Sequence, residues 1–517
     1  METLAEIKTE TETEVEVEVV IAGAGPTGLM LAYELTLAGV ETLVLEKLPQ
    51  RVEQVKGGAI QPRTAELLES RGLLEPLLHR VTSRDPAGGH FAMLPVPLDC
   101  TPWRTRHPYT IGIPQWEIEE VLENHATAAG ARILRGIAFS GVESYDDGVI
   151  VKAEGLKVRA RYLVACDGGH STVRKQLGLP FPGRPGTHQA VLADIRLSAA
   201  SSLVPQQTGH ISTLTRRAGS YWSMLVPLGD DRYRFTFGRT DETDQTDHTD
   251  HTSNDRDAPI THAEIAAALQ AVYGDETTLC AVDNSSRFSD ATRQLENYRA
   301  GRVLFAGDAA HIHPPLGGQG LNLGIQDAFN LGWKLAAAVQ GRAPSNLLDS
   351  YHAERHPVGA QVLHHTSAQR VLADPNPSED VAALRDIFTD LLRLPDTNRH
   401  MAGLISGLSL RYALPGEHPL TGQRMPDTDL LTEAGPARLS ALLTSGHAVL
   451  LDLAKAVPAD LRLPPQVDFV RATCPDDVGA TAVLIRPDGY VCWATSGSTA
   501  DDDALLAATT STLTTVR

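Results

Sequence analysis

The sequence has few cysteines, no excess of basic residues and no long uninterrupted run of apolar residues. Its five cysteines among 517 residues form no CxxC pair, so we expect no disulfide framework, no dithiol chemistry and a reducing compartment. Lysine and arginine number 45 against 64 aspartate and glutamate residues, which gives a net charge of -19. Because such an acidic surface repels nucleic acid and anionic lipid, we expect neither as a partner.

The N-terminal segment lacks the features of a signal peptide. Its first 18 residues carry seven glutamates and one lysine, without a basic region or an apolar core, and residues 1–14 are predicted to form a disordered acidic tail. The following apolar stretch, residues 19–33, is interrupted by glycine and proline and is shorter than the about 20 residues that span a bilayer. These features predict a cytoplasmic protein.

The pattern along the chain indicates several domains, as the length suggests at roughly 150 residues per domain. A strand over residues 15–22, a glycine-rich turn, a helix from Thr27 and a strand over 41–46 form a predicted βαβ unit. Alternating segments between about 185 and 290 favour a more antiparallel layer. The segment after about 420 indicates a small α/β domain. Residues 241–257 contain no large apolar residue, so His248 and His251 are predicted to lie in a solvated loop and not in a metal site.

The glycine-rich turn is typical of a nucleotide-binding fingerprint. Gly23, Gly25 and Gly28 match GxGxxG, with a strand before the turn and a helix after it. Glycines permit the tight turn and let a pyrophosphate approach the N–H groups at the start of the helix. Glu46 ends the next strand, where a carboxylate can accept hydrogen bonds from the hydroxyls of an adenosine ribose. This fingerprint alone leaves FAD and NAD as alternatives.

Three further segments favour a flavin. Asp308 follows the apolar strand 302–305, where a carboxylate can accept a hydrogen bond from a ribityl hydroxyl. The glycine- and proline-rich loop 314–322 opens a helix whose N-terminus would stabilise negative charge on a reduced flavin. Asp167, in the segment 166–174, likewise follows a strand and precedes a helix.

In this order and spacing, the motifs resemble those of class A FAD-dependent aromatic hydroxylases, particularly the branch that acts on aromatic polyketides. The resemblance covers about residues 15–517. It implies an α/β fold in which residues 15–180 and 285–400 form a discontinuous Rossmann-like FAD-binding domain with trailing helices. Residues 181–284 would form an α+β substrate-binding domain, and residues 401–517 a thioredoxin-like domain.

The resemblance also implies roles for individual residues. Gln115 would touch the flavin linker, Arg63 corresponds to a structural arginine of the same segment, and Lys56 replaces an arginine near the pyrophosphate, keeping the charge but losing the bidentate fork. The family uses the stretch around His311 and His313 as flavin-contacting backbone, so we predict no metal there despite the HxH spacing. The full predicted cofactor set is Gly23, Gly25, Pro26, Thr27, Gly28, Glu46, Lys56, Arg63, Gln115, Asp167, Asp308, Pro315, Gly317, Gly320, Leu321 and Asn322, with Pro314, Gly317, Gly318 and Gly320 in the flavin-facing loop.

The implied activity is hydroxylation of a polycyclic aromatic substrate, as in antibiotic biosynthesis, by a monomer or homodimer. NADPH or NADH would reduce FAD, O2 would give a C4a-hydroperoxyflavin, and this species would oxygenate the ring. Because the cofactor carries the chemistry, no side chain is assigned as catalytic. Baeyer–Villiger oxygenation, a flavin reductase or dehydrogenase, and a flavin-bound sensor or partner-binding protein remain alternatives. The predicted substrate-facing residues are Trp222, Met224, Phe235 and Phe237.

Overall fold

A six-stranded sheet forms the centre of the part of the chain that is predicted to bind FAD, here named the FAD-binding part. The computed structural model describes residues 13–53, 58–81, 89–240, 259–458 and 461–513. The strand order is β18-β19-β10-β2-β3-β6, and every pair except β18–β19 is parallel. Its strands are β2 (Val19–Ala22), β3 (Thr42–Glu46), β6 (Arg132–Arg135), β10 (Tyr162–Ala165), β18 (Arg299–Ala300) and β19 (Val303–Phe305). Since β19 joins this sheet from far along the chain, the FAD-binding part is discontinuous.

Helices and a smaller sheet surround these strands. Helix α1 (Pro26–Leu37) packs against α4 (Gln115–Ala128) and α8 (Gly320–Val339). A second sheet has the order β1-β9-β8-β7, with β1 (Thr13–Glu16), β7 (Phe139–Ser144), β8 (Val149–Ala153) and β9 (Leu156–Ala160). Thr13 and Glu14 pair with β9, so the predicted tail boundary at residue 14 was wrong, because these two residues complete a sheet edge.

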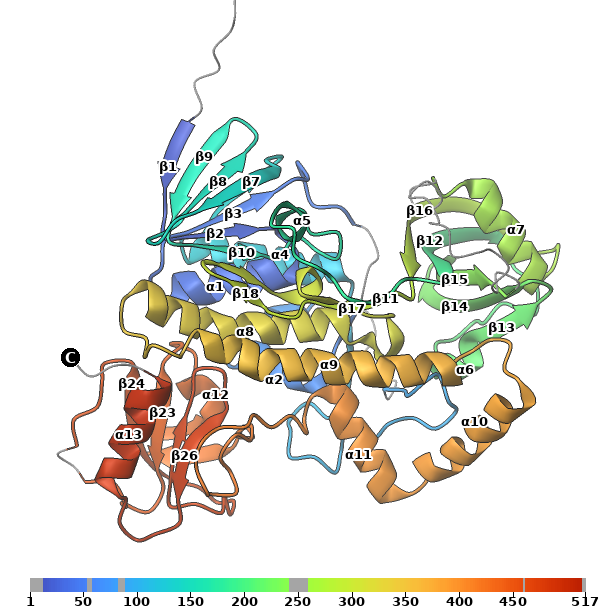
Figure 1. Cartoon of the computed structure of the whole chain (residues 1–517). Coiled ribbons are helices and arrows are strands. Elements are labelled where there is room, and N and C mark those ends of the chain that lie inside the picture. The colour runs from blue at the N-terminus through green and yellow to red at the C-terminus, as the bar shows by residue number, and fades with distance from the viewer. Residues whose placement is uncertain (1–12, 54–57, 82–88, 241–258, 459–460, 514–517) are drawn as a thin grey trace, which may run out of the picture.

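The middle part is an antiparallel sheet covered on one face by a helix. The strand order is β13-β14-β15-β12-β16, and α7 (His262–Tyr273) packs on it (Figure 1). The strands are β12 (Gln189–Ala199), β13 (Thr215–Ala218), β14 (Tyr221–Gly229), β15 (Arg232–Arg239) and β16 (Thr278–Ser289), with α6 (Ile211–Leu214) before β13. Three short strands, β11 (Gly183–Arg184), β17 (Thr292–Gln294) and β20 (His311–Ile312), form the connection to the FAD-binding part.

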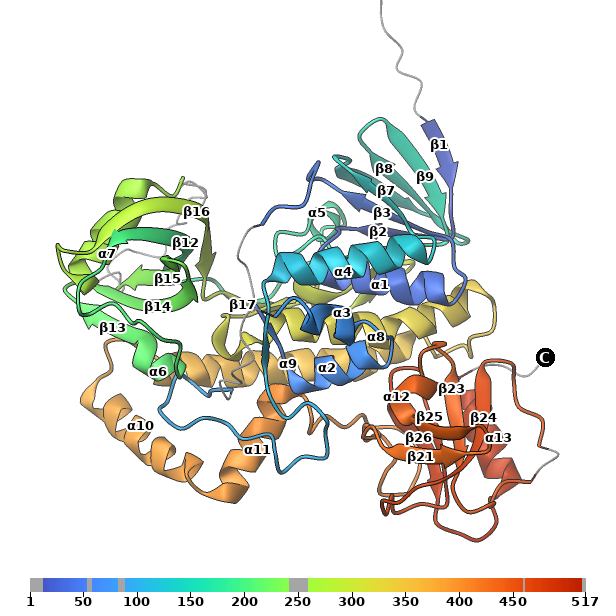
Figure 2. The same ribbon diagram turned by 180° about the vertical axis from the view of Figure 1, so that it is seen from behind.

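A long helix, α9 (Asp349–Leu372), runs from the FAD-binding part to the middle part, and α10 (Glu379–Leu392) and α11 (Pro395–Ser406) follow it (Figure 2). The C-terminal sheet has the order β22-β21-β24-β23-β25-β26. Its elements are β21 (Asp429–Thr432), β22 (Gly435–Arg438), α12 (Leu439–Leu442), β23 (Ala448–Asp452), β24 (Val467–Thr473), β25 (Ala482–Ile485), β26 (Val491–Thr495) and α13 (Asp502–Thr512). Its thioredoxin-like character stays a prediction.

Shorter elements complete the described chain. They are β4 (Ala59–Ile60), β5 (Ile111–Gly112), α2 (Pro62–Glu69), α3 (Leu74–Leu78), α5 (Thr172–Gln176) and the 3-10 turns η1 (Gly307–Ala309) and η2 (Leu316–Gly318). Within the described ranges, none of the helices combines the length and the apolarity needed to cross a bilayer.

Candidate functional site

The glycine-rich turn between β2 and α1 is closely packed at two of its glycines and open at the third. A β-carbon at Gly23, where φ is +104°, would lie 2.4 Å from the carbonyl oxygen of Cys166, and one at Gly28 would lie 2.1 Å from that of Gly23. A β-carbon at Gly25 would meet nothing within 4 Å. The turn therefore leaves space at Gly25, where the fingerprint places a pyrophosphate.

Glu46 lies against this turn, as the strand-end position predicted. Its Oε2 accepts a hydrogen bond of 2.8 Å from the backbone N–H of Ala24, and its Oε1 accepts one of 2.9 Å from that of Leu48. The carboxylate is thereby held at the end of β3, beside the turn. Its contact with a ribose stays a prediction.

The segment that contains Asp308 packs directly on the glycine-rich turn. Gly307 has a φ of +60°, and a β-carbon there would lie 2.6 Å from Thr27 Oγ1. A β-carbon at Gly324 of α8 would lie 2.2 Å from the same oxygen. The Asp308 side chain is exposed. Thr27 thus brings two motifs that are 280 positions apart in sequence, at Thr27 and Gly307, into contact.

Asp167 and Arg174 join the third motif to this centre. Asp167 Oδ2 accepts hydrogen bonds from the N–H groups of Thr172 and Val173, at 2.6 and 3.1 Å, and so caps α5. Its buried Oδ1 has no hydrogen-bond partner among the described residues. Arg174 Nη1 donates to the carbonyl of Ala309, next to Asp308, at 2.9 Å. The sequence analysis assigned no role to Arg174, although this arginine ends the segment 166–174 that contains Asp167.

The flavin-facing loop is held by amide side chains. Asn322 Oδ1 accepts from the N–H of Gln61 at 2.8 Å, and its Nδ2 donates to the carbonyls of Ala59 and Gly318, each at 2.9 Å. Gln61 Nε2 donates to the carbonyl of Gly317 at 3.0 Å. β4 and η2 therefore form one unit. Sequence reasoning assigned no role to Gln61, whose partner lies 256 positions away.

Arg63 and Gln115, both predicted to contact the cofactor, form hydrogen bonds with other groups of the protein. Arg63 is buried and donates to Glu66 Oε2 at 3.0 Å and to the carbonyl of Asp488 at 2.8 Å, so its guanidinium joins α2 to the C-terminal domain. Its contact with the cofactor stays a prediction. Gln115 begins α4, and its Nε2 donates to Glu119 Oε1 at 2.8 Å. Lys56 lies outside the described residues, as do His248 and His251.

The predicted substrate-facing residues divide between the two faces of the middle sheet. Phe235 and Phe237 are buried against α7, with ring centroids 4.8 Å apart, so their assignment as substrate walls was wrong. Trp222 pairs with Gly238 and Met224 with Thr236. Because side chains alternate along a strand, Trp222 and Met224 lie on the opposite face, and their contact with substrate stays a prediction.

Arg234 belongs to this second face and points toward the cofactor region. It pairs with Asp194, its Nε lying 3.1 Å from Oδ1, and its Nη1 would lie 3.2 Å from a β-carbon at Gly58. Gly58 immediately precedes β4, whose Ala59 holds the flavin-facing loop. The face of Trp222 and Met224 therefore approaches this loop, and Arg234 is a candidate site residue that the sequence pattern did not indicate.

A buried carboxylate stabilises the loop that follows β19. Asp327 of α8 accepts hydrogen bonds from the N–H of Gly307 at 3.1 Å and from Arg355 Nε at 2.7 Å, and its Oδ2 lies 2.7 Å from His311 Nε2. Burial would raise the pKa of this carboxyl, but Arg355 and His311 hold it below its ordinary value. His311 thus meets a carboxylate, and among the described residues no group of three or more His, Cys, Asp or Glu could hold a metal.

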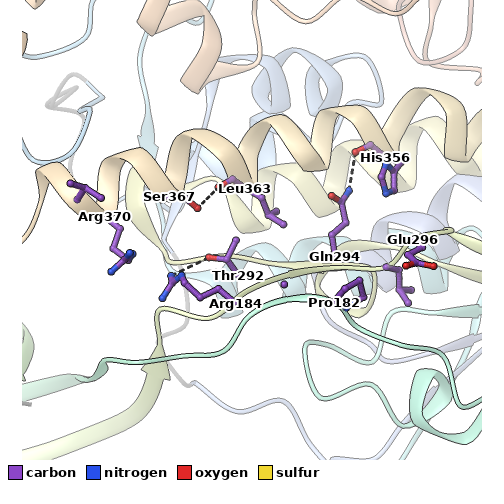
Figure 3. Close-up of a pocket in the computed structure, with 12 residues that line it drawn as sticks. Pro182, Arg184, Thr292, Gln294, Glu296, His356, Leu363, Ser367 and Arg370 are labelled. Carbon is purple, nitrogen blue, oxygen red and sulfur yellow. Dashed lines mark hydrogen bonds between the residues drawn. The ribbon is translucent and has the colours of Figure 1, made fainter. Parts of the chain in front are cut away.

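Two cavities lie near these elements. A groove of about 610 Å³ between α9 and the strands β11 and β17 is lined by Arg184, Gln294, His356, Leu363 and Arg370, among others (Figure 3). None of the predicted cofactor or substrate residues lines it. A smaller cavity of about 250 Å³ includes Gln61 and Asn322 in its lining and so reaches the flavin-facing loop.

Comparisons with known proteins agree with this geometry. The family described as "FAD binding domain" matches residues 16–366, and "Aromatic-ring hydroxylase, C-terminal" matches residues 418–515. The chain is 46% identical over 497 residues to a 12-dehydrotetracycline 5-monooxygenase/anhydrotetracycline 6-monooxygenase of Streptomyces rimosus, which covers 93% of this chain and 96% of that protein.

A solved structure of OxyS anhydrotetracycline hydroxylase from Streptomyces rimosus is 44% identical and matches with a TM-score of 0.85, over 96% of this chain and 99% of that chain. A relative of a different kind is the dialkyldecalin synthase of Streptomyces rugosporus. It is 38% identical over 474 residues, which is 91% of this chain and 94% of that protein.

Proposed function

The chain belongs to the FAD-dependent monooxygenases with an aromatic-ring hydroxylase C-terminal domain, and we propose that it hydroxylates a polycyclic aromatic substrate of the polyketide type. The printed activities of the tetracycline-pathway relatives support this substrate class. The observation that carries the proposal is the convergence of three motifs on one edge of the parallel sheet. Thr27 lies against Gly307 and Gly324, and Arg174 donates to Ala309.

The residues of this edge fit FAD. Gly25 and Glu46 would hold the ADP half, Asp308 the ribityl chain, and the loop ending at Asn322 the flavin ring. When bound, FAD would supply the oxygenating chemistry: two electrons from NADPH or NADH would allow one atom of O2 to enter the substrate while the other leaves as water. The N-terminus of α8 would stabilise negative charge on the reduced flavin.

The middle sheet would position the substrate. The face that carries Trp222 and Met224 approaches the flavin-facing loop through Arg234 and Gly58. An aromatic substrate between this face and the flavin would exclude water from the reacting atoms. Arg234, on the same face, would offer a positive charge to an ionised phenol of such a substrate.

The test measures flavin, reductant and oxygen in one preparation. Purified protein should release FAD on denaturation, consume NADPH or NADH with a panel of anthraquinone and angucycline compounds, and yield a product heavier by one oxygen atom from isotopically labelled O2. The variant Asp308→Ala should bind FAD more weakly by about 1 to 3 kcal/mol, the cost of leaving a ribityl hydroxyl of the bound cofactor without its hydrogen-bond partner. Reductant oxidation with no labelled product would instead support a flavin reductase, and an ester product would support Baeyer–Villiger oxygenation.

The similarity to a dialkyldecalin synthase, and to a solved structure described as a Diels–Alderase, supports a second candidate function, ring formation by cycloaddition without net oxidation. In that case the product would have the mass of the substrate, and turnover would proceed without NADPH, NADH or O2. An anaerobic incubation without reductant distinguishes the two functions, because only the synthase would turn over.

A further inference from the structure

The C-terminal domain contacts the FAD-binding part through buried aromatic and charged side chains. Tyr412 is 5% exposed, and its ring centroid lies 4.3 Å from that of Tyr490 and 5.3 Å from the guanidinium carbon of Arg486. Its hydroxyl oxygen accepts a hydrogen bond of 3.1 Å from Arg355 Nη1. Tyr412 therefore connects the β25–β26 turn to helix α9.

Arg355 continues this connection toward the predicted cofactor loop. It is fully buried, and its Nε donates to Asp327 Oδ1 at 2.7 Å. Asp327 Oδ2 accepts a hydrogen bond of 3.1 Å from the N–H of Gly307 and lies 2.7 Å from His311 Nε2. Since Gly307 and His311 lie on either side of Asp308, Asp327 fixes both ends of the segment that carries the predicted ribityl ligand.

A buried ion pair of this kind is a poor way to gain stability alone, because removing two charges from water costs several kcal/mol. Arg355 and Asp327 instead fix the positions of the groups to which they are hydrogen-bonded, because a hydrogen bond requires a defined distance and angle between donor and acceptor. We propose that the C-terminal domain determines how firmly FAD is held, with Tyr412, Arg355 and Asp327 as positioning residues for the segment 307–311. This inference rests on the proposed function, because it takes Asp308 to be a FAD ligand.

The test is the variant Tyr412→Phe, which removes the hydroxyl and keeps the ring that packs on Tyr490. The lost hydrogen bond acts on FAD only through the segment 307–311, so only part of its free energy affects the cofactor and FAD release is expected to speed up about fivefold. The visible circular dichroism of bound FAD, which reports contacts on the flavin itself, should also change. The matched control is Arg104→Gln, which removes an exposed pair with Asp476 between the FAD-binding part and the C-terminal domain and should change neither readout.

The double variant Tyr412→Phe with Asp308→Ala supplies a second measurement. Because both changes act on one segment, their effects on FAD release should be less than additive. Release at the wild-type rate with an unchanged flavin spectrum would overturn the inference, even if thermal stability fell, and so would additive effects. A wild-type protein that binds no FAD would instead refute the proposed function.

Discussion

Replacing Gly317 with alanine tests whether the flavin-facing loop depends on left-handed backbone. Gly317 has φ of 77° and ψ of 4°. A β-carbon there would lie 3.6 to 3.7 Å from the side chains of Gln369 and Gln319, which is ordinary van der Waals contact. The substitution is therefore not limited by space. Its cost is the left-handed conformation, which is worth roughly 1–2 kcal/mol for a residue with a side chain.

Gly320 supplies the matched control. It begins α8 without a positive φ, and a β-carbon there would lie 3.7 Å from His313 Nε2. Alanine is more favourable than glycine in a helix, so Gly320→Ala adds no backbone strain and should bind FAD within about twofold of the wild type. Since about 1.4 kcal/mol is tenfold, Gly317→Ala should weaken FAD binding about 5- to 30-fold.

The assay is fluorescence titration of the apoprotein with FAD, with far-ultraviolet circular dichroism to establish that both variants fold. Equal dissociation constants for Gly317→Ala and Gly320→Ala would refute the argument, because they would show that the left-handed residue has no special part in the site. The sequence pattern places both glycines in the flavin-facing loop without distinguishing them. The backbone angles separate them.

Phe235→Ala should lower the free energy of unfolding by about 3–5 kcal/mol, because it leaves a cavity in the core, and should leave the product unchanged. Trp222→Ala should alter the KM for the substrate with little effect on the urea midpoint. The reverse pattern would contradict the faces assigned to these two side chains. Glu46→Gln should weaken FAD binding without changing the regiochemistry of the product, and full FAD affinity would argue against its role at the ribose. Burial, with smaller effects from neighbouring histidines, lowers the pKa of His365 to about 4. The imidazole of His365 binds a proton near pH 6.5 in the unfolded chain and only near pH 4 in the folded protein. His365 should therefore reduce the free energy of unfolding by up to about 3 kcal/mol as the pH falls through this window. Urea midpoints of the wild type and His365→Gln that change equally between pH 7.5 and pH 5 would contradict this expectation.

Local patterns were sufficient for the cofactor motifs and insufficient for the faces of the middle sheet. The strand, the glycine-rich turn and the helix of the β2–turn–α1 unit are contiguous in sequence, so they could be predicted together. The face of a strand depends on which side a helix covers, and the distant α7 decides that Phe235 is core while Trp222 is not. The partner of Arg63 lies 425 positions away in the C-terminal domain, and no local signal indicates it.

The glycines of the three motifs do not share one physical purpose. Gly23, Gly28, Gly307 and Gly324 each face an atom within 2.6 Å of where a β-carbon would lie, and that atom belongs to the protein. They permit close packing among the turn, the Asp308 segment and α8, largely around Thr27. Gly25 alone among these five faces open space, so it is the one whose lack of a side chain leaves room for a ligand. The GxGxxG spacing therefore combines one position that would admit the pyrophosphate with two that assemble the surface against which it would bind. The segment that follows β19 contributes Gly307 to that assembly and would contribute Asp308 to the cofactor.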